Sequence, residues 1–140
     1  DRRITWNRID DLSLKKIVIC EAAIDCMSYC QLRHEPGTGY MSTSGTQFND
    51  EQREQLAQLL GKAAGMGAKI VLAMDADAAG EKMAQEVASM APQGAKVVRE
   101  VPEVGKDWND ALRAVLAAQE AQRELARRLE REHQAPGMRM

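Results

Sequence analysis

Two aspartates, Asp75 and Asp77, stand one residue apart directly after a short apolar run. The run covers residues 70–74, and Gly80 follows three residues after the second aspartate. Such a run, ending in acids and a glycine, is typical of a buried parallel strand that turns into a helix. Two unit charges ~4 Å apart repel by about 4 kcal/mol at an effective dielectric constant near ~20. Because carboxylate oxygens favour a hard cation, the pair predicts a site for Mg²⁺ or Mn²⁺.

Two further blocks carry acids at positions where chemistry is possible. Glu21 follows the apolar residues 17–20, and Asp25 comes four residues later. The third block is Gly-Lys-Asp-Trp-Asn-Asp-Ala-Leu, which gathers a cation and two acids at an expected helix start: Lys106, Asp107 and Asp110. Each block alone also fits a surface acid or a helix cap, with the tryptophan in the core. The blocks therefore gain meaning only if the fold brings them together.

The Asp75–Asp77 pair has other interpretations. Either carboxylate could cap the following helix, but that leaves the second one unexplained. An EF-hand loop counted from Asp75 has Glu86 at position 12, yet Ala79 at position 5 and the preceding strand-like run argue against it. A haloacid-dehalogenase-type phosphatase also uses Asp-x-Asp after a buried strand, although its signature usually comes early in the chain and is soon followed by Thr or Val.

The elements that must position these residues alternate four times along the chain. Apolar runs predict strands at residues 17–20, 40–44, 70–74 and around 97–98, and helical patterns cover residues 25–33, 50–64, 79–90 and 107 onward. This alternation predicts an α/β fold: a four-stranded, mostly parallel sheet flanked by helices, with a long C-terminal helix. Glu21, Ser44 and Asp75 then stand at the carboxyl ends of strands, where functional crevices form in such sheets.

Length and composition set bounds on the domain organisation. A chain of 140 residues predicts one domain, which we place at residues 15–118. Residues 1–14 are polar and are expected to be irregular, whereas residues 119–140 predict a charged helix and tail. Hydrophobic residues make up 44% but aromatic residues only 4%, so aliphatic side chains and Met must fill the core. The net charge of −2 argues against a strongly basic nucleic-acid platform.

Cysteine usage and hydropathy indicate the compartment. Cys20, Cys26 and Cys30 are three cysteines within eleven residues, an odd number that disfavours a disulfide framework and favours a reducing cytoplasm. We interpret them as small hydrophobic side chains. No signal peptide or membrane-spanning run is predicted, so no membrane partner is expected. The chain begins with Asp1, and we interpret it as a piece of a larger parent protein.

Taken in order, the three blocks resemble a Toprim domain, the module shared by bacterial primases, topoisomerases and some nucleases. In that family a Glu follows the first strand and an Asp-x-Asp follows the third, positions matched here by Glu21 and by Asp75 with Asp77. The chain looks most similar to Toprim-like domains in primase and mobilisation proteins of plasmids, phages and other mobile elements. Those tend to carry Leu-Ser-x-Ser-Gly and Lys-Asp-Trp-Asn-Asp, which match residues 41–45 and 106–110 here. Ala22 and Ala23 depart from the family pattern after the first strand.

The resemblance implies a magnesium-dependent module for nucleotidyl or phosphoryl transfer on nucleic acid, most similar to the Toprim part of a DNA primase. Asp75 and Asp77 would hold the cation, and Glu21 would act as general acid/base or as a further ligand. The resemblance also implies a second set that would hold another cation or contact phosphate: Asp25, Lys106, Asp107 and Asp110. Expected partners are nucleic acid, nucleotides and the other domains of the parent protein. The alternative is a non-catalytic module that binds nucleic acid or a protein partner.

Overall fold

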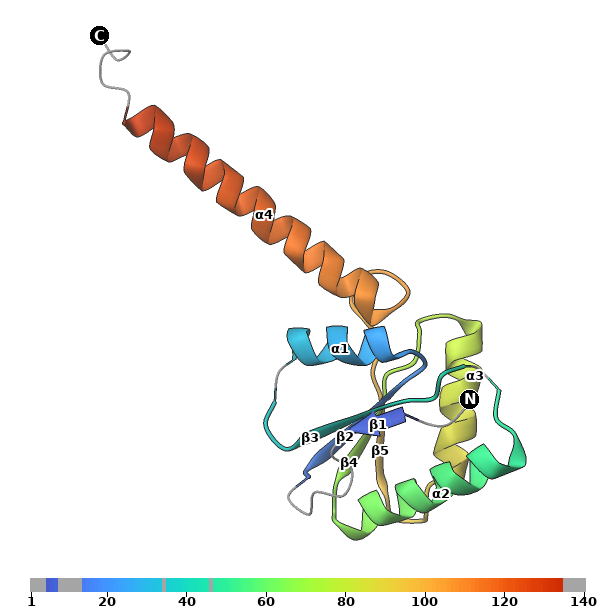
Figure 1. The fold of residues 1–140 in the computed structure, drawn as a ribbon. Helices are drawn as coiled ribbons and strands as arrows, with labels where there is room; N and C mark the ends of the chain where they lie inside the picture. The colour runs from blue at the N-terminus through green and yellow to red at the C-terminus, as the bar shows by residue number, and fades with distance from the viewer. Residues whose placement is uncertain (1–4, 8–13, 34, 46, 135–140) are drawn as a thin grey trace.

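The computed structural model describes residues 5–7, 14–33, 35–45 and 47–134, with side chains from residue 14 onward. The strands and helices are, in chain order, β1 (Thr5–Asn7), β2 (Lys16–Cys20), α1 (Ala23–Leu32), β3 (Thr38–Ser42), α2 (Asp50–Gly65), β4 (Lys69–Leu72), α3 (Ala78–Met90), β5 (Lys96–Arg99) and α4 (Trp108–His133). Figure 1 shows a central sheet with helices on both faces and α4 extending well beyond it. The predicted fold class is therefore confirmed.

The sheet has the strand order β1-β3-β2-β4-β5. Strands β3, β2, β4 and β5 are parallel, and β1 pairs antiparallel with β3 at one edge. The fifth strand corrects our expectation that residues 1–14 are irregular, because Thr5–Asn7 pair with residues 40–42. A strand of three residues is too short to show the alternation from which strands are predicted.

The strands β2 and β4 are buried on both faces, which explains their continuous apolar sequence. Ile17 and Ile70 face the core beneath α2 and α3. Val18 and Val71, one residue further along each strand, face the second core beneath α1 and α4. Successive side chains of a strand point to opposite faces, so these two runs of branched residues supply both cores at once.

The capping residues of three helices were visible in the sequence. Asn49 caps α2 through a reciprocal pair of hydrogen bonds with Gln52, and Asp77 and Asp107 cap α3 and α4. In each case a side-chain oxygen accepts a hydrogen bond from a backbone N–H that has no partner within the helix. These caps hold the amino ends of the helices at the carboxyl edge of the sheet.

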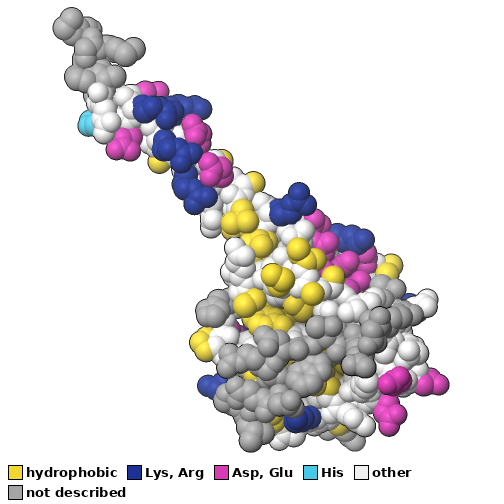
Figure 2. Space-filling model, viewed as in Figure 1, with side chains coloured by type: hydrophobic (Ala, Val, Ile, Leu, Met, Phe, Trp, Pro, Cys, Tyr) yellow, Lys and Arg dark blue, Asp and Glu magenta, His cyan; other side chains and the backbone are white. Residues whose placement is uncertain are grey.

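Helix α4 changes character along its length. Its first turn buries Trp108 and Ala111, while every residue from Val115 to Gln134 is exposed. Figure 2 shows hydrophobic side chains gathered near its base and charged side chains of both signs further out. Ion pairs such as Arg127 with Glu120 and Glu124 lie along this outer part, as expected for a solvated helix. None of the helices described is both long and apolar enough to span a membrane.

Two glycines in helices allow a matched test of how closely α3 packs against the segment after β4. A Cβ added at Gly80 would lie 2.0 Å from the carbonyl oxygen of Asp75, whereas one added at Gly61 would meet nothing within 4 Å. We expect Gly80→Ala to lower the free energy of unfolding by about 1–3 kcal/mol, because α3 must move away from the residue-75 backbone. Gly61→Ala should raise it by about 0.5–1 kcal/mol through helix propensity. Urea unfolding measures both, and equal effects would contradict this packing.

Candidate metal site at the carboxyl edge of the sheet

The strand order places a crevice between the carboxyl ends of β2 and β4. The chain leaves β2 toward β3 on one side and later returns to β4 on the other, so the connections diverge between these two neighbours. This is the switch point at which open α/β sheets bind ligands. Glu21 follows β2, and Asp75 follows β4, at this point. Residues 54 positions apart in sequence therefore meet at one edge.

Three carboxylates converge there: Asp25, Asp75 and Asp107. One oxygen from each lies within 4.8 Å of the others. They come from the first turn of α1, from the segment after β4 and from the N-cap of α4. An all-oxygen donor set of this kind suits a hard divalent cation such as Mg²⁺.

The electrostatics of Asp25 show how crowded this cluster is. Asp25 is only 5% exposed, and its carboxylate accepts a hydrogen bond from the backbone N–H of Asn109 at 3.3 Å. Burial raises the pKa of Asp25 to about 6, and the nearby carboxylates of Asp107 and Asp75 add to the rise. The hydrogen bond from Asn109 acts in the opposite direction but does not cancel it. A bound cation would oppose the repulsion between these carboxylates and would favour the ionised form of Asp25.

Glu21 and Asp75 share the same environment. A carboxylate oxygen of Glu21 lies 3.4 Å from the backbone nitrogen of Asp75, which donates to it. The pKa of Glu21 is raised by burial and then by the Asp75 charge. The pKa of Asp75 is raised by burial and then by Asp107 and Asp77, against the opposing effect of Lys106. Acidic side chains from the ends of β2 and β4 therefore lie close together at the switch point.

Asp77 has a different setting. Its side chain accepts a hydrogen bond from the backbone N–H of Gly80 at 2.7 Å and forms an ion pair with Lys106 at 3.2 Å. These two contacts lower the pKa of Asp77. The helix-cap interpretation thus describes Asp77 but not Asp75. In the described part of the chain, the group of carboxylates close enough to share an ion includes neither Asp77 nor Glu21, and the role of each as a ligand stays a prediction.

The block at residues 105–110 is organised by Trp108. Its indole N–H donates to the carbonyl of Ala73 at 3.0 Å, which fastens the start of α4 to the segment following β4. The Asp107 carboxylate accepts from the backbone N–H of Asp110 at 2.8 Å, and the Asp110 carboxylate accepts from that of Lys106 at 3.1 Å. The backbone N–H of Ala76 also donates to the carbonyl of Lys106 at 2.6 Å. The bonds from Trp108 and Ala76 therefore join the block of Asp75 and Asp77 directly to the block at residues 105–110.

Arg99 contributes to the site although sequence reasoning did not select it. From the end of β5 its guanidinium donates to three backbone carbonyls around the end of β4, those of Leu72 (3.0 Å), Met74 (2.8 Å) and Asp75 (2.8 Å). It also pairs with Glu81 at 3.0 Å. The planar five-donor group suits this task, which lysine cannot perform in the same way. Only the register of β5 beside β4 reveals it, because a lone arginine after a short strand carries no signal.

Comparison with known proteins identifies the fold. A family model described as Toprim-like matches residues 18–112. The chain belongs to the Toprim-like family. The match covers all three blocks of this Toprim-like chain, from β2 to the first turns of α4. No curated protein matches it.

Two solved structures are similar to this Toprim-like chain. One is the primase fragment of the bacteriophage T7 primase-helicase protein, at 24% identity and a TM-score of 0.49, covering 81% of this chain and 42% of that one. The other is bacteriophage T7 lagging-strand DNA polymerase interacting with primase domains of two gp4 subunits bound to an RNA/DNA hybrid and dTTP. There the identity is 24% and the TM-score 0.50, covering 76% of this chain and 50% of that one. This chain thus spans half or less of the length of those two chains. The similarity to the second structure supports the assignment of the fold.

The raised pKa of Asp25 predicts how stability depends on pH without metal. The folded protein keeps the Asp25 proton up to about pH 6, whereas the ordinary pKa is 3.8. Between these values the folded state binds more protons than the unfolded state, so the free energy of unfolding falls as the pH rises, by at most about 3 kcal/mol. Glu21 and Asp75 are shifted in the same direction. Urea unfolding in EDTA from pH 4 to pH 7 measures the slope.

Two variants separate the Asp25 contribution from general charge effects. Asp25→Asn should flatten the slope between pH 4 and pH 6, because the group that takes up the proton is gone. Asp50→Asn removes the same charge from an exposed position in the first turn of α2 and should leave the slope unchanged. An equal slope in wild type and Asp25→Asn would show that Asp25 does not titrate as described.

The contacts of Arg99 predict a local effect on the segment after β4. We expect Arg99→Gln to speed amide hydrogen exchange at Ala76 by about tenfold or more, since hydrogen bonds from a charged group are each worth about 1.5–3 kcal/mol. Arg113→Gln, at an exposed position on α4, is the matched control and should leave that rate unchanged. If Arg99→Gln exchanged no faster than the control, the clamp on these carbonyls would be refuted.

Proposed function

We propose that this Toprim-like domain is a magnesium-dependent catalytic module for nucleotidyl or phosphoryl transfer on nucleic acid. We further propose that it is the Toprim part of a DNA primase-like protein of a mobile element and works in the cytoplasm. The observation that carries the proposal is the convergence of Asp25, Asp75 and Asp107 at the switch point. Manganese could replace magnesium at such a site, because both favour carboxylate oxygen.

The residues divide into four roles in this proposal. Asp75 and Asp107, together with Asp25, hold the cation, which when bound stabilises charge on the reacting phosphate. Glu21 stands beside them as general acid/base, a role supported by the rise of its pKa through burial and the nearby Asp75 charge. Lys106, paired with Asp77, lies at the rim, where it can contact a phosphate. Asp110 acts indirectly, because its carboxylate holds the backbone of Lys106.

The family and the fold support nucleic acid and nucleotides as partners. A likeness in fold links this chain to a structure whose primase domains are bound to an RNA/DNA hybrid and dTTP, and we propose the same kinds of ligand here. Because the chain spans half or less of the similar solved chains, we propose that other domains of a parent protein complete the activity.

Two other functions fit these observations less well. A phosphatase of the haloacid-dehalogenase type usually has Thr or Val soon after its second Asp and carries the signature early in the chain, whereas Ala78 and Ala79 follow Asp77 here and the pair lies mid-chain. A non-catalytic binding module has no need for carboxylates held together at a cost in free energy. It is favoured only if no divalent ion binds, and a magnesium titration therefore separates it from the catalytic module.

The test is a magnesium titration of this chain followed by NMR. We expect saturable shifts at Glu21, Asp25, Asp75 and Asp107 below ~10 mM Mg²⁺. Asp75→Asn should weaken binding by about tenfold or more, because one charged ligand is lost, and should slightly raise the melting temperature without metal by relieving repulsion. The charge-matched control Asp50→Asn should leave magnesium affinity unchanged and should not raise the melting temperature, because Asp50 lies in the first turn of α2, where a negative charge stabilises the helix.

The same titration has outcomes that contradict the proposal. If Mg²⁺ produced no saturable shift at the cluster, or if Asp75→Asn bound it as wild type does, the metal site would be wrong and the binding module would be favoured. Catalysis is then measured in the parent protein with Glu21→Gln, which should lose primer synthesis while keeping magnesium affinity within about tenfold. Full activity of that variant would remove Glu21 from the mechanism.

A further inference from the structure

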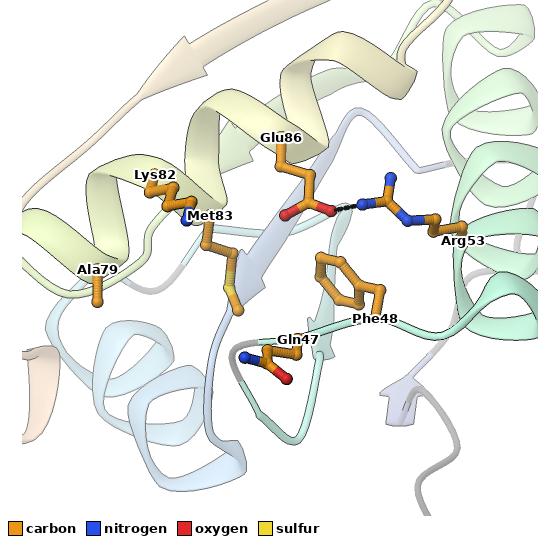
Figure 3. A pocket seen from close by; sticks show the side chains of 7 residues that line it. All are labelled: Gln47, Phe48, Arg53, Ala79, Lys82, Met83 and Glu86. Atoms are coloured by element: carbon orange, nitrogen blue, oxygen red, sulfur yellow. Dashed lines mark hydrogen bonds and ion pairs between the residues drawn. The ribbon is translucent and has the colours of Figure 1, made fainter.

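A pocket outside the acidic cluster lies between α2 and α3, on the opposite face of the sheet from α1. It has a volume of about 710 Å³ and is lined by Gln47, Phe48, Arg53, Ala79, Lys82, Met83 and Glu86. Figure 3 shows these side chains. Its volume falls within the range of about 300–1,000 Å³ that is typical of small-molecule sites.

The lining combines an apolar surface with polar groups at its margins. Met83 is buried, and Phe48 is half-buried against the same core. In Figure 3 the Phe48 ring lies between Gln47 on one side and the ion pair of Arg53 with Glu86 on the other. The partly exposed Phe48 ring, with the buried Met83 thioether at the pocket floor beside it, suits a planar heterocycle, because the ring can stack on its face. Gln47 and the ion pair offer donors and acceptors to the edge of such a ring.

The charges at the pocket favour a phosphate. Arg53 and Lys82 bring two positive charges against the single carboxylate of Glu86. Lys82 is exposed on α3, one turn from the amino end of that helix. The amino end of a helix favours negative charge. An aromatic face and an excess of cations occur together in proteins that bind nucleotides of single strands.

The position of the pocket connects it to the acidic cluster. Ala79 lies in the first turn of α3, two residues after Asp77, so the pocket is at the same carboxyl edge of the sheet. The segment after β3 that leads to Gln47 is also held to α3, because the buried Thr43 hydroxyl contacts the sulfur of Met83 at 3.8 Å. The Met-Ser-Thr-Ser-Gly block at residues 41–45 ends two residues before Gln47 in the sequence.

We propose that this pocket binds one nucleotide, with the base against Phe48 and Met83 and the phosphate toward Lys82. The proposal rests on the proposed function and extends it. The acidic cluster is proposed to hold a cation, and the pocket adds a binding site for the base and phosphate of a nucleotide. The nucleotide is either a free one or one unit of a single strand, and both present the same base and phosphate.

The test uses adenosine 5′-monophosphate, adenosine and a single-stranded deoxyadenosine pentamer, all in EDTA, with the methionine methyl groups followed by NMR. The Met83 methyl signal should shift saturably with the monophosphate, while that of Met27, exposed on α1, should not. A response of Met83 to the pentamer assigns the pocket to a strand, and a response to the monophosphate alone assigns it to a free nucleotide. No response to either overturns the proposal.

Two pairs of variants identify the contacts. Phe48→Leu should weaken binding about fivefold or more, since base stacking on an aromatic ring is worth about 1–3 kcal/mol, whereas Phe48→Tyr keeps the ring and should stay within about twofold. Lys82→Gln should weaken binding of the monophosphate but not of adenosine. Lys96→Gln, an exposed lysine at the start of β5, is the matched control and should change neither.

The outcomes separate this proposal from the proposed function. Binding in EDTA needs no divalent ion, so failure of the magnesium titration leaves a positive result at Met83 standing. A thermal melt shows whether Phe48→Leu folds. If this variant does not fold, the comparison of Lys82→Gln with Lys96→Gln tests the pocket independently. Wild-type affinity in both Phe48→Leu and Lys82→Gln overturns the pocket even where magnesium binds the cluster.

Discussion

Carboxylates that repel one another must be held together by the structure beneath them. The indole N–H of Trp108, which bonds to the carbonyl of Ala73, is the contact on which this arrangement depends most. It brings the N-cap of α4, and with it Asp107, to the end of β4, where Asp75 lies. Because Trp108 is 1% exposed and packs at 4.7 Å between ring centres against Tyr29 of α1, the same side chain also fixes the helix that carries Asp25. Apolar burial thus balances the electrostatic cost at this edge.

The cations near the site are arranged to leave the carboxylate cluster available. Arg99 bonds to the backbone carbonyls of Met74 and Asp75, and so orients the segment that bears Asp75. Lys106 pairs with Asp77, whose other oxygen caps α3. Asp77 thereby draws the positive charge of Lys106 toward the start of α3, although the two aspartates are almost adjacent in sequence. One acid of the motif stabilises structure, and the other joins a group that can hold an ion.

Much of this could be predicted from the sequence because the signals are local. The runs before Glu21 and Asp75 show strands buried on both faces, and Asn49, Asp77 and Asp107 mark helix starts by the chemistry of their side chains. The position of Asp25 beside Asp75 and Asp107 could not be predicted in this way. It depends on the packing of α1 against α4, which places the buried Asp25 over the N-cap of α4. The contribution of Arg99 is likewise set by strand register alone.

The pocket and the acidic cluster share one short segment of chain. From Asp75 to Ala79 the backbone passes from the cluster, through the cap of α3, to the pocket wall. Gly80 allows the first turn of α3 to approach the carbonyl of Asp75, so a shift of α3 caused by a ligand in the pocket would be transmitted to that carboxylate's backbone. Arg99 opposes such a shift, because it bonds to the same carbonyl and to Glu81 of α3. This one arginine therefore joins the segment that carries Asp75 to the helix that lines the pocket.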